Sequence, residues 1–231
     1  MRTQRAVGAA AIALVVSMII QNVVLASGAP TYADPMATVL AFHAEHRAAV
    51  ALAVGLEALN VLLLLGFVTG LHGMVTRRGR SGADGSRLAV ASAATASAAF
   101  GLYAVLWMGV VFSARDLSSP TATLEVIWRM HAAAFGFALA ALGATFAGAA
   151  WAATSSKLTP AWQRLLGLFG GGLMLVGGMA SGVVADGSPI IFVGIAGIGG
   201  WLVWLLATGI RLVRARPADQ SRQTPILSSQ A

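Results

Sequence analysis

The sequence lacks cysteine altogether and has few charged residues. Of its 231 residues, 58% are hydrophobic and 10% are charged, whereas soluble domains carry about 25% charged residues. Without cysteine, disulfide bonds, thiolate metal sites and cysteine nucleophiles are excluded. A chain of this length cannot bury so much apolar surface in a water-soluble core, so we expect lipid to surround part of it.

The sequence also lacks the motifs that usually indicate a reaction. We find no P-loop, no H-E-x-x-H and no G-x-S-x-G pattern, and no aspartate array of the kind that holds metal in prenyl or phosphatidyl transferases. Lys157 is the only lysine and falls between apolar segments, so it does not support a Schiff base inside a bundle. The net charge is +7, but the arginines lie in loops, where they set membrane orientation. We therefore predict no cofactor and no nucleic-acid partner.

Six long apolar segments are what the chain does have. They cover residues 7–25, 48–71, 88–112, 132–153, 165–185 and 190–213. Each is close to the roughly 20 residues that a membrane-spanning helix needs. We predict an all-α membrane protein in which residues 1–216 form one bundle of six transmembrane helices. Residues 217–231 are predicted to be a flexible cytoplasmic tail.

The basic residues lie mostly on one side of the predicted six-helix bundle. One side receives Arg2, Arg5, Arg77, Arg78, Arg80, Arg87, Lys157, Arg164, Arg211, Arg214, Arg216 and Arg222. The other side receives Arg47, Arg115 and Arg129. Cytoplasmic loops are enriched in such residues, so both termini are predicted to be cytoplasmic, in the inner membrane of a bacterium. The alternative, that residues 7–25 are a cleaved signal peptide, is less favoured because that run exceeds the usual ~7–15 residues.

Glycine is dense in the fifth apolar segment. Gly167 and Gly171, and also Gly178 and Gly182, have the small-xxx-small spacing that lets helix backbones approach closely in lipid. Packing within the bundle is the favoured interpretation, and a homodimer through this helix is the alternative.

Glu57 is the residue on which the functional hypothesis depends. It lies about ten residues into the second segment, hence about 15 Å deep at 1.5 Å per residue. An ionised carboxylate at that depth costs about 2.5 kcal/mol or more, so we expect a neutral acid that faces the bundle interior. Asn60 is three residues further on and shares its face. The alternative is a Glu57 that only hydrogen-bonds neighbouring helices.

Aromatic residues at a matching depth complete a predicted cavity. Counting along each segment places these residues near Glu57: Tyr103, Trp107, Phe135, Met179, Ser181 and Trp201. His131 is predicted to bind the ligand together with Asn60 and the aromatic residues. A mostly apolar pocket with a few polar groups suits a lipophilic ligand. The alternative is that Trp107 and Trp201 only pack or face lipid. Trp128 and Trp162 are interpreted as anchors at the membrane interface.

Two histidines precede the second segment. His43 and His46 are three residues apart and could share a helical face and a metal ion. Glu57 is too far along the helix to complete such a site. Solvated or interfacial histidines are the favoured interpretation, so no metal site is predicted.

Two stretches in the second half of the chain carry a family resemblance. They are residues 128–135 (WRMHAAAF) and residues 158–162 (LTPAW), the latter followed by the glycine-rich segment. They resemble a large group of small six-helix bacterial membrane proteins of unknown function, in which a Leu-Pro-x-Trp turn often joins helices four and five. Here Thr159 stands before the proline, and the glycine expected soon after Trp162 comes only at Gly167. The resemblance implies a six-helix fold and no activity, and the composition is similar to that of actinobacterial proteins.

These observations lead to one functional hypothesis and two alternatives. The leading hypothesis is a membrane protein that binds a lipophilic, isoprenoid or lipid-like molecule in a cavity anchored by Glu57 and Asn60. The first alternative is an acid-catalysed terpene-cyclase-like enzyme or isomerase, with Glu57 as the general acid and aromatic rings that stabilise a carbocation. The second is a substrate-binding subunit of a transporter.

Overall fold

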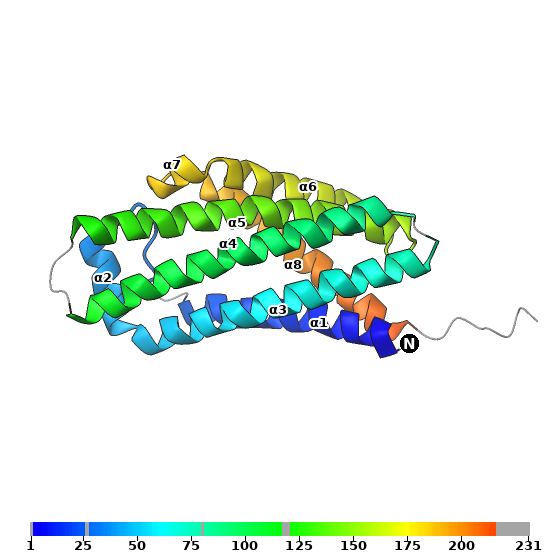
Figure 1. The fold of residues 1–231 in the computed structure, drawn as a ribbon, viewed down its shortest axis with the longest axis horizontal. Helices are drawn as coiled ribbons and strands as arrows, with labels where there is room; N and C mark the ends of the chain where they lie inside the picture. Colours follow the sequence, from blue (N-terminus) through cyan, green and yellow to red (C-terminus); the bar gives the residue numbers. More distant parts are fainter. Residues whose placement is uncertain (1, 26–27, 80, 117–120, 216–231) are drawn as a thin grey trace, which may run out of the picture.

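The computed structural model of the protein describes residues 2–25, 28–79, 81–116 and 121–215, and this part of the chain is helical, with no strand (Figure 1). The helices are α1 (Arg2–Leu25), α2 (Met36–Glu45), α3 (Arg47–Arg77), α4 (Ala83–Asp116), α5 (Ala122–Ser155), α6 (Ala161–Met179), α7 (Ser181–Ala185) and α8 (Ile191–Arg214). The predicted tail, residues 217–231, lies outside the described residues.

The six long helices form a closed ring. Each packs on the next in the order α1, α3, α4, α5, α6 and α8, and α8 packs back on α1. Successive long helices alternate in direction, so α1 begins and α8 ends at the same end of the molecule (Figure 1). We call this the terminus end, and the opposite end, which holds α2 and α7, the α2 end.

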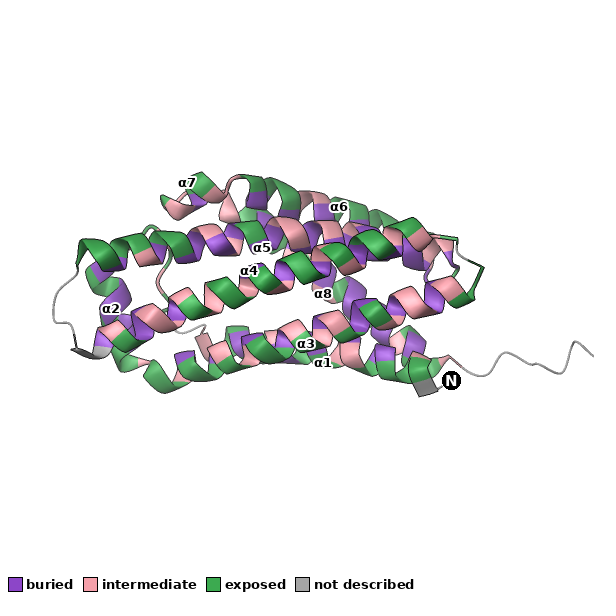
Figure 2. Cartoon of the chain, viewed as in Figure 1, coloured by how far each residue is buried: buried purple, intermediate pink, exposed green. Residues whose placement is uncertain are grey.

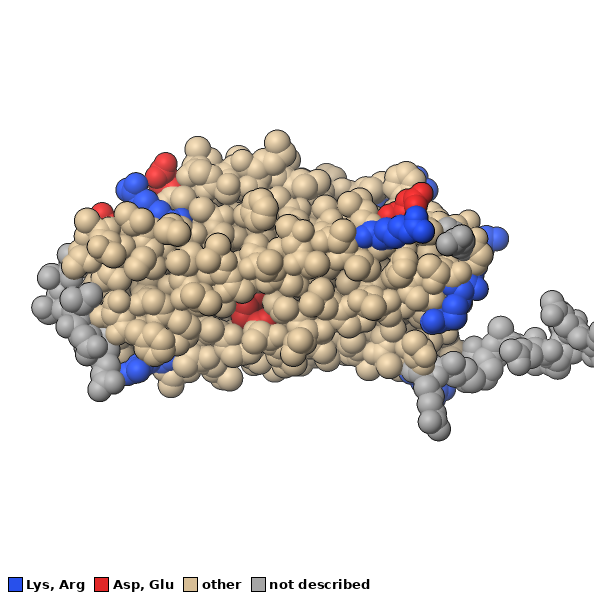
Figure 3. All heavy atoms as spheres, viewed as in Figure 1, with Lys and Arg blue, Asp and Glu red and all other residues tan. Residues whose placement is uncertain are grey.

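The outer surface of the ring is apolar over its middle. Large side chains point away from the ring, among them Leu62, Val105 and Phe169, which are 68%, 69% and 71% exposed. Figure 2 shows that the helix faces turned into the ring are buried and those turned outward are exposed, and Figure 3 shows that the outward surface carries few charges between the two ends. Five helices (α1, α3, α4, α5 and α8) are long and apolar enough to cross a membrane. The chain is therefore a polytopic helical membrane protein.

The fifth apolar segment differs from the expected single helix. Residues 165–185 form α6 and α7, which are separated by a break at Ala180. α6 has 19 residues, of which several are glycines, and it is not among the five helices that meet the length and hydropathy of a span. The count of six transmembrane helices therefore stays a prediction.

The short helix α2 was not expected from the sequence. Its ten residues bury one side, formed by Met36, Val39, Leu40, Phe42 and His43, against the end of the bundle. It packs on α4 and α3, and it shares a core with Trp107 and Trp128. The predicted loop before the second apolar segment is therefore a cap over the ring.

Glycines bring the helix backbones of the ring together. A Cβ on Gly171 of α6 would lie 2.7 Å from the Gly143 carbonyl oxygen of α5. A Cβ on Gly8 of α1 would lie 2.7 Å from the Gly209 carbonyl oxygen of α8, where the ring closes. A side chain at either position would push the helices apart. Since the buried glycines of α6 are used inside the chain, homodimerisation through this helix, which stays a prediction, would use its opposite face.

Gly178, at the end of α6, and Gly182, in α7, provide a destabilising substitution and its matched control. A Cβ on Gly178 would lie 2.5 Å from the Cβ of Ala140 in α5, whereas a Cβ on Gly182 would meet nothing within 4 Å. We expect Gly178→Leu to lower the free energy of unfolding by about 1–3 kcal/mol, the usual cost of overpacking. Gly182, which shares the small-xxx-small spacing with Gly178, is expected to tolerate leucine, and Gly182→Leu should change the free energy of unfolding by less than about 0.5 kcal/mol. Thermal unfolding of both variants in one detergent would measure this, and equal stability would contradict the ring packing.

Candidate functional site

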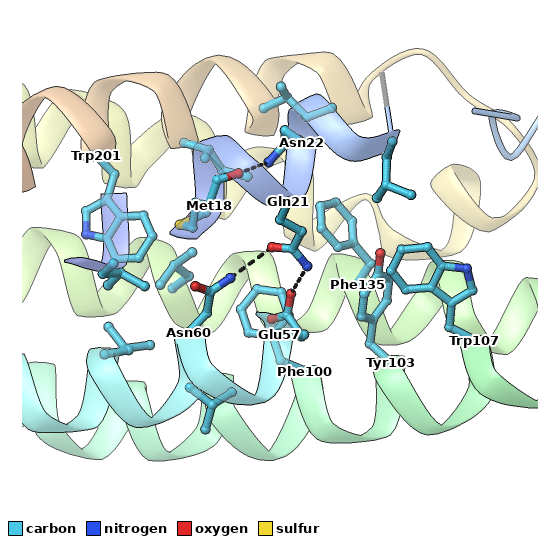
Figure 4. Close-up of a pocket in the computed structure, with 17 residues that line it drawn as sticks. Met18, Gln21, Asn22, Glu57, Asn60, Phe100, Tyr103, Trp107, Phe135 and Trp201 are labelled. Atoms are coloured by element: carbon cyan, nitrogen blue, oxygen red, sulfur yellow. Dashed lines mark hydrogen bonds between the residues drawn. The ribbon is translucent and has the colours of Figure 1, made fainter. Parts of the chain in front are cut away.

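A cavity of about 190 Å³ lies between the helices of the ring (Figure 4). Helices α1, α3, α4, α5 and α8 all contribute to its wall. Most lining side chains are apolar, and the polar ones are Gln21, Asn22, Glu57 and Asn60, together with the hydroxyl of Tyr103 and the indoles of Trp107 and Trp201.

Gln21 of α1 joins the two polar residues that the sequence predicted on α3. Its amide nitrogen donates to Glu57 Oε2 at 2.7 Å and to the Ala53 carbonyl oxygen at 3.0 Å. Its amide oxygen accepts from Asn60 Nδ2 at 2.9 Å. Figure 4 shows the three side chains meeting at the cavity wall. Helix spacing alone put Glu57 and Asn60 on one face, and α1 supplies the group that connects them.

Gln21, Glu57 and Asn60, which we call the polar triad, leave one buried oxygen without a hydrogen-bond partner in the part of the chain that the structure describes. Glu57 is 8% exposed and Asn60 6% exposed. The Asn60 Oδ1 atom is buried and has no hydrogen-bond partner among the described residues. Figure 3 shows Asp or Glu atoms midway along the otherwise apolar face. The site therefore presents a free acceptor and a carboxyl within an apolar wall.

Four of the five ring-bearing ligand residues predicted from the sequence line the same cavity as Glu57. Tyr103, Trp107, Phe135 and Trp201 all contribute to its wall, and Phe100 joins them. The ring centroids of Tyr103 and Trp107 are 5.5 Å apart, and those of Tyr103 and Phe135 are also 5.5 Å apart. The alternative in which Trp107 and Trp201 face lipid is wrong, because they are only 5% and 3% exposed.

A second, larger cavity of about 700 Å³ adjoins the first at the α2 end. The two share the lining residues Asn22, Leu25, Tyr103, Trp107, Phe135 and Ile195. His131, the remaining predicted site residue, lines this second cavity and not the first. We call the first the inner cavity and the second the outer cavity. Tyr103, Trp107 and Phe135 lie where they meet.

His131 is held in a stack of aromatic rings. It lies between Trp128 and Tyr103, with ring centroids 4.9 Å and 4.1 Å away. Its Nδ1 atom is 3.0 Å from the Tyr103 carbonyl oxygen. Trp128 was predicted to be an interface anchor, and this is wrong, because it is 8% exposed and packs under α2. The predicted start of the fourth segment at residue 132 was also too late, since α5 begins at Ala122 and places Trp128 within the helix.

His43 is fixed by hydrogen bonds at both ring nitrogens. Its Nδ1 donates to the Val39 carbonyl oxygen at 2.6 Å, and its Nε2 accepts from Trp107 Nε1 at 2.8 Å. This pattern requires a neutral ring and leaves neither nitrogen for a metal. Burial lowers the pKa of His43, the hydrogen bond to Val39 opposes this shift, and nearby His46 adds to it. His43 therefore holds Trp107 in place where the two cavities meet.

The comparisons with known proteins identify a family and no activity. Residues 6–209 match the family described as "Domain of unknown function (DUF4386)". No curated protein and no solved structure matches the chain. Since the match covers most of the 231 residues, the chain belongs to the DUF4386 family of proteins of unknown function.

Proposed function

We propose that this membrane protein binds a lipophilic small molecule inside the ring, with Gln21, Glu57 and Asn60 as its polar anchors. The observation that carries the proposal is the triad at the wall of the inner cavity, with the Asn60 oxygen unpaired. A buried acceptor without a partner costs about 1–3 kcal/mol. A ligand that donates a hydrogen bond there would recover that energy.

The size and lining of the cavities agree with such a ligand. Ligand pockets usually have volumes of about 300–1,000 Å³ with apolar walls and a few polar groups. The inner and outer cavities, about 190 Å³ and 700 Å³, together fall within that range. An isoprenoid or lipid-like body could lie along the aromatic residues while its polar end reaches Glu57.

The aromatic wall also favours a second candidate, an acid-catalysed cyclase or isomerase. Tyr103, Trp107 and Trp201 line the inner cavity together with Glu57. A neutral Glu57 would protonate an alkene, and the aromatic faces would stabilise the resulting carbocation. Turnover of an isoprenoid substrate that is lost in Glu57→Gln would favour this candidate over binding alone. The transporter-subunit alternative stays a prediction, and no feature of the described residues favours it.

Filling the inner cavity tests the binding proposal. Leu64 lines the cavity and is 3% exposed, whereas Leu62, two residues earlier, points outward and is 68% exposed. We expect a hydrophobic molecule to co-purify with the parent protein and with Leu62→Trp, and to be lost from Leu64→Trp. Extraction and mass spectrometry of the purified proteins would measure this. The proposal fails if Leu64→Trp folds and still retains the same molecule.

We further propose that the protein crosses a bacterial inner membrane six times, with both termini in the cytoplasm. At the terminus end lie Arg5, Arg77, Arg78, Arg87, Lys157, Arg164, Arg211 and Arg214, and at the α2 end lie Arg47 and Arg129. This asymmetry supports the orientation through the positive-inside rule.

The absence of cysteine makes this orientation easy to measure. Asp84, at the terminus end, and Glu45, at the α2 end, are both exposed. In intact cells, we expect an impermeant maleimide to label Glu45→Cys and not Asp84→Cys. Labelling of Asp84→Cys alone would reverse the orientation.

A further inference from the structure

We propose that the inner cavity takes a lipophilic ammonium, that is, an apolar molecule with a primary or secondary amine that is protonated when bound. This inference rests on the proposed binding function and names the chemical class of its ligand. The ammonium group would lie against Glu57 and Asn60, and the apolar body would extend towards the outer cavity.

The charges that line the cavities support this choice. Among the described residues that line the inner and outer cavities, none is a lysine or an arginine, and Glu57 is the carboxyl group. Of the two histidines that line the outer cavity, His43 accepts a hydrogen bond at Nε2 and is therefore neutral. His131 is stacked between Trp128 and Tyr103, and its Nδ1 is 3.0 Å from the Tyr103 carbonyl oxygen. A cationic ligand would meet no lysine or arginine among the described lining residues and one carboxyl group, Glu57, whose ionised form a bound ammonium would favour.

The hydrogen bonds of the triad also favour a donor-rich ligand. Both amide hydrogens of Gln21 are used, by Glu57 and by the Ala53 carbonyl oxygen. Asn60 Oδ1 has no partner, and Glu57 uses only its Oε2 atom in the triad. The unfilled acceptor positions are therefore Asn60 Oδ1 and Glu57 Oε1, against one unassigned donor, the second amide hydrogen of Asn60. An ammonium group supplies several N–H donors, and its hydrogen bonds to a carboxylate are roughly twice as strong as those between neutral groups.

The outer cavity, at the α2 end, also has a lining that favours a cation. Rings of Tyr32, Trp128 and Trp107 line the outer cavity, and aromatic faces attract cations at close range. A third hollow beside Tyr32 and Trp128 is lined by Asp34, Glu125 and Asp186, with Arg129 as its basic residue. Hydrogen bonds from Thr31 lower the pKa of Asp34 and keep it ionised. The excess of carboxylates raises the local concentration of cations next to the outer cavity.

Two probes of equal chain length test the inference. Decylammonium and decanol would be titrated into the purified full-length protein in a nonionic detergent, with calorimetry as the measurement. We expect decylammonium to bind about 10- to 100-fold more tightly than decanol, which is the difference expected between charged and neutral hydrogen bonding. Glu57→Gln should bring the two affinities close together, whereas Glu45→Gln, an exposed residue outside both cavity linings, should preserve the preference.

The remaining outcomes separate the two proposals. Decanol that binds as tightly as decylammonium to the parent protein overturns the ammonium inference and leaves the binding function standing. Leu64→Trp, which fills the inner cavity, should lose both probes, and undiminished binding of decylammonium to it would place the amine elsewhere and also overturn the inference. If neither probe binds the parent protein and no hydrophobic molecule co-purifies with it, the proposed function itself fails. The comparison of decylammonium with decanol on the parent protein tests the ammonium inference even if Glu57→Gln does not fold.

Discussion

Gln21→Leu is expected to destabilise the protein by about 2–4 kcal/mol, since it removes the centre of the polar triad. Three hydrogen bonds are lost, to Glu57, Asn60 and the Ala53 carbonyl oxygen. Interhelical hydrogen bonds in membranes average about 0.6 kcal/mol each, which accounts for about half of the effect. The remainder comes from the buried groups that leucine leaves without partners. Loss of the co-purifying ligand should accompany the loss of stability, because Glu57 and Asn60 would no longer be held in place.

Asn22 provides the matched control for Gln21. It is the next residue, it is exposed, and its side chain donates only to the Met18 carbonyl oxygen of its own helix at 2.8 Å. Asn22→Leu should change the free energy of unfolding by less than about 0.5 kcal/mol. Unfolding of both variants would be followed by circular dichroism in the same detergent. If the two substitutions were equally mild, the triad would be unimportant for holding α1 against α3.

Acidification is expected to destabilise the protein through His43. In the unfolded chain a histidine takes up a proton near pH 6.5. Burial lowers the pKa of His43 in the folded protein, so between these two values the unfolded state binds more protons. The free energy of unfolding should therefore be highest above about pH 6.5 and fall as the pH is lowered from about 7.5 to about 5.5. Protonation would also remove the acceptor of the Trp107 indole, whose hydrogen bond is 2.8 Å long.

The variants His43→Phe and His46→Phe distinguish this cause from a general effect of acid. His43→Phe leaves the buried Trp107 N–H without an acceptor, so it should cost about 1–3 kcal/mol at neutral pH. His43→Phe should also reduce the dependence of the free energy of unfolding on pH. Both variants keep His131, so any contribution from that residue is the same in each. His46 is half-buried and its Nδ1 contacts only the Phe42 carbonyl oxygen of its own helix, so His46→Phe should keep most of the pH dependence. An unchanged pH profile in His43→Phe would assign the effect to another group.

The positions of the long helices could be predicted from the sequence, because hydropathy is a local property. Five of the six predicted apolar segments each fall on one helix, and the fifth is divided between α6 and α7. The depth of Glu57 and its shared face with Asn60 follow from helix geometry alone. The separation of basic residues to one end is likewise set by the order of loops along the chain. Helix limits were less accurate, since α4 and α5 extend well beyond their apolar cores.

The faces that turn inward were decided only by the tertiary structure. In a water-soluble helix the apolar side marks the core, but in lipid both sides are apolar, so periodicity carries little information about which side packs. For this reason no local pattern indicated that Gln21 would meet Glu57, 36 residues away, or that α8 would close the ring on α1. The burial of Trp128 depends in the same way on α2, a helix too short to be recognised as a span. Composition and local pattern determined that this chain enters a membrane as helices, and packing between distant segments determined where its polar site lies.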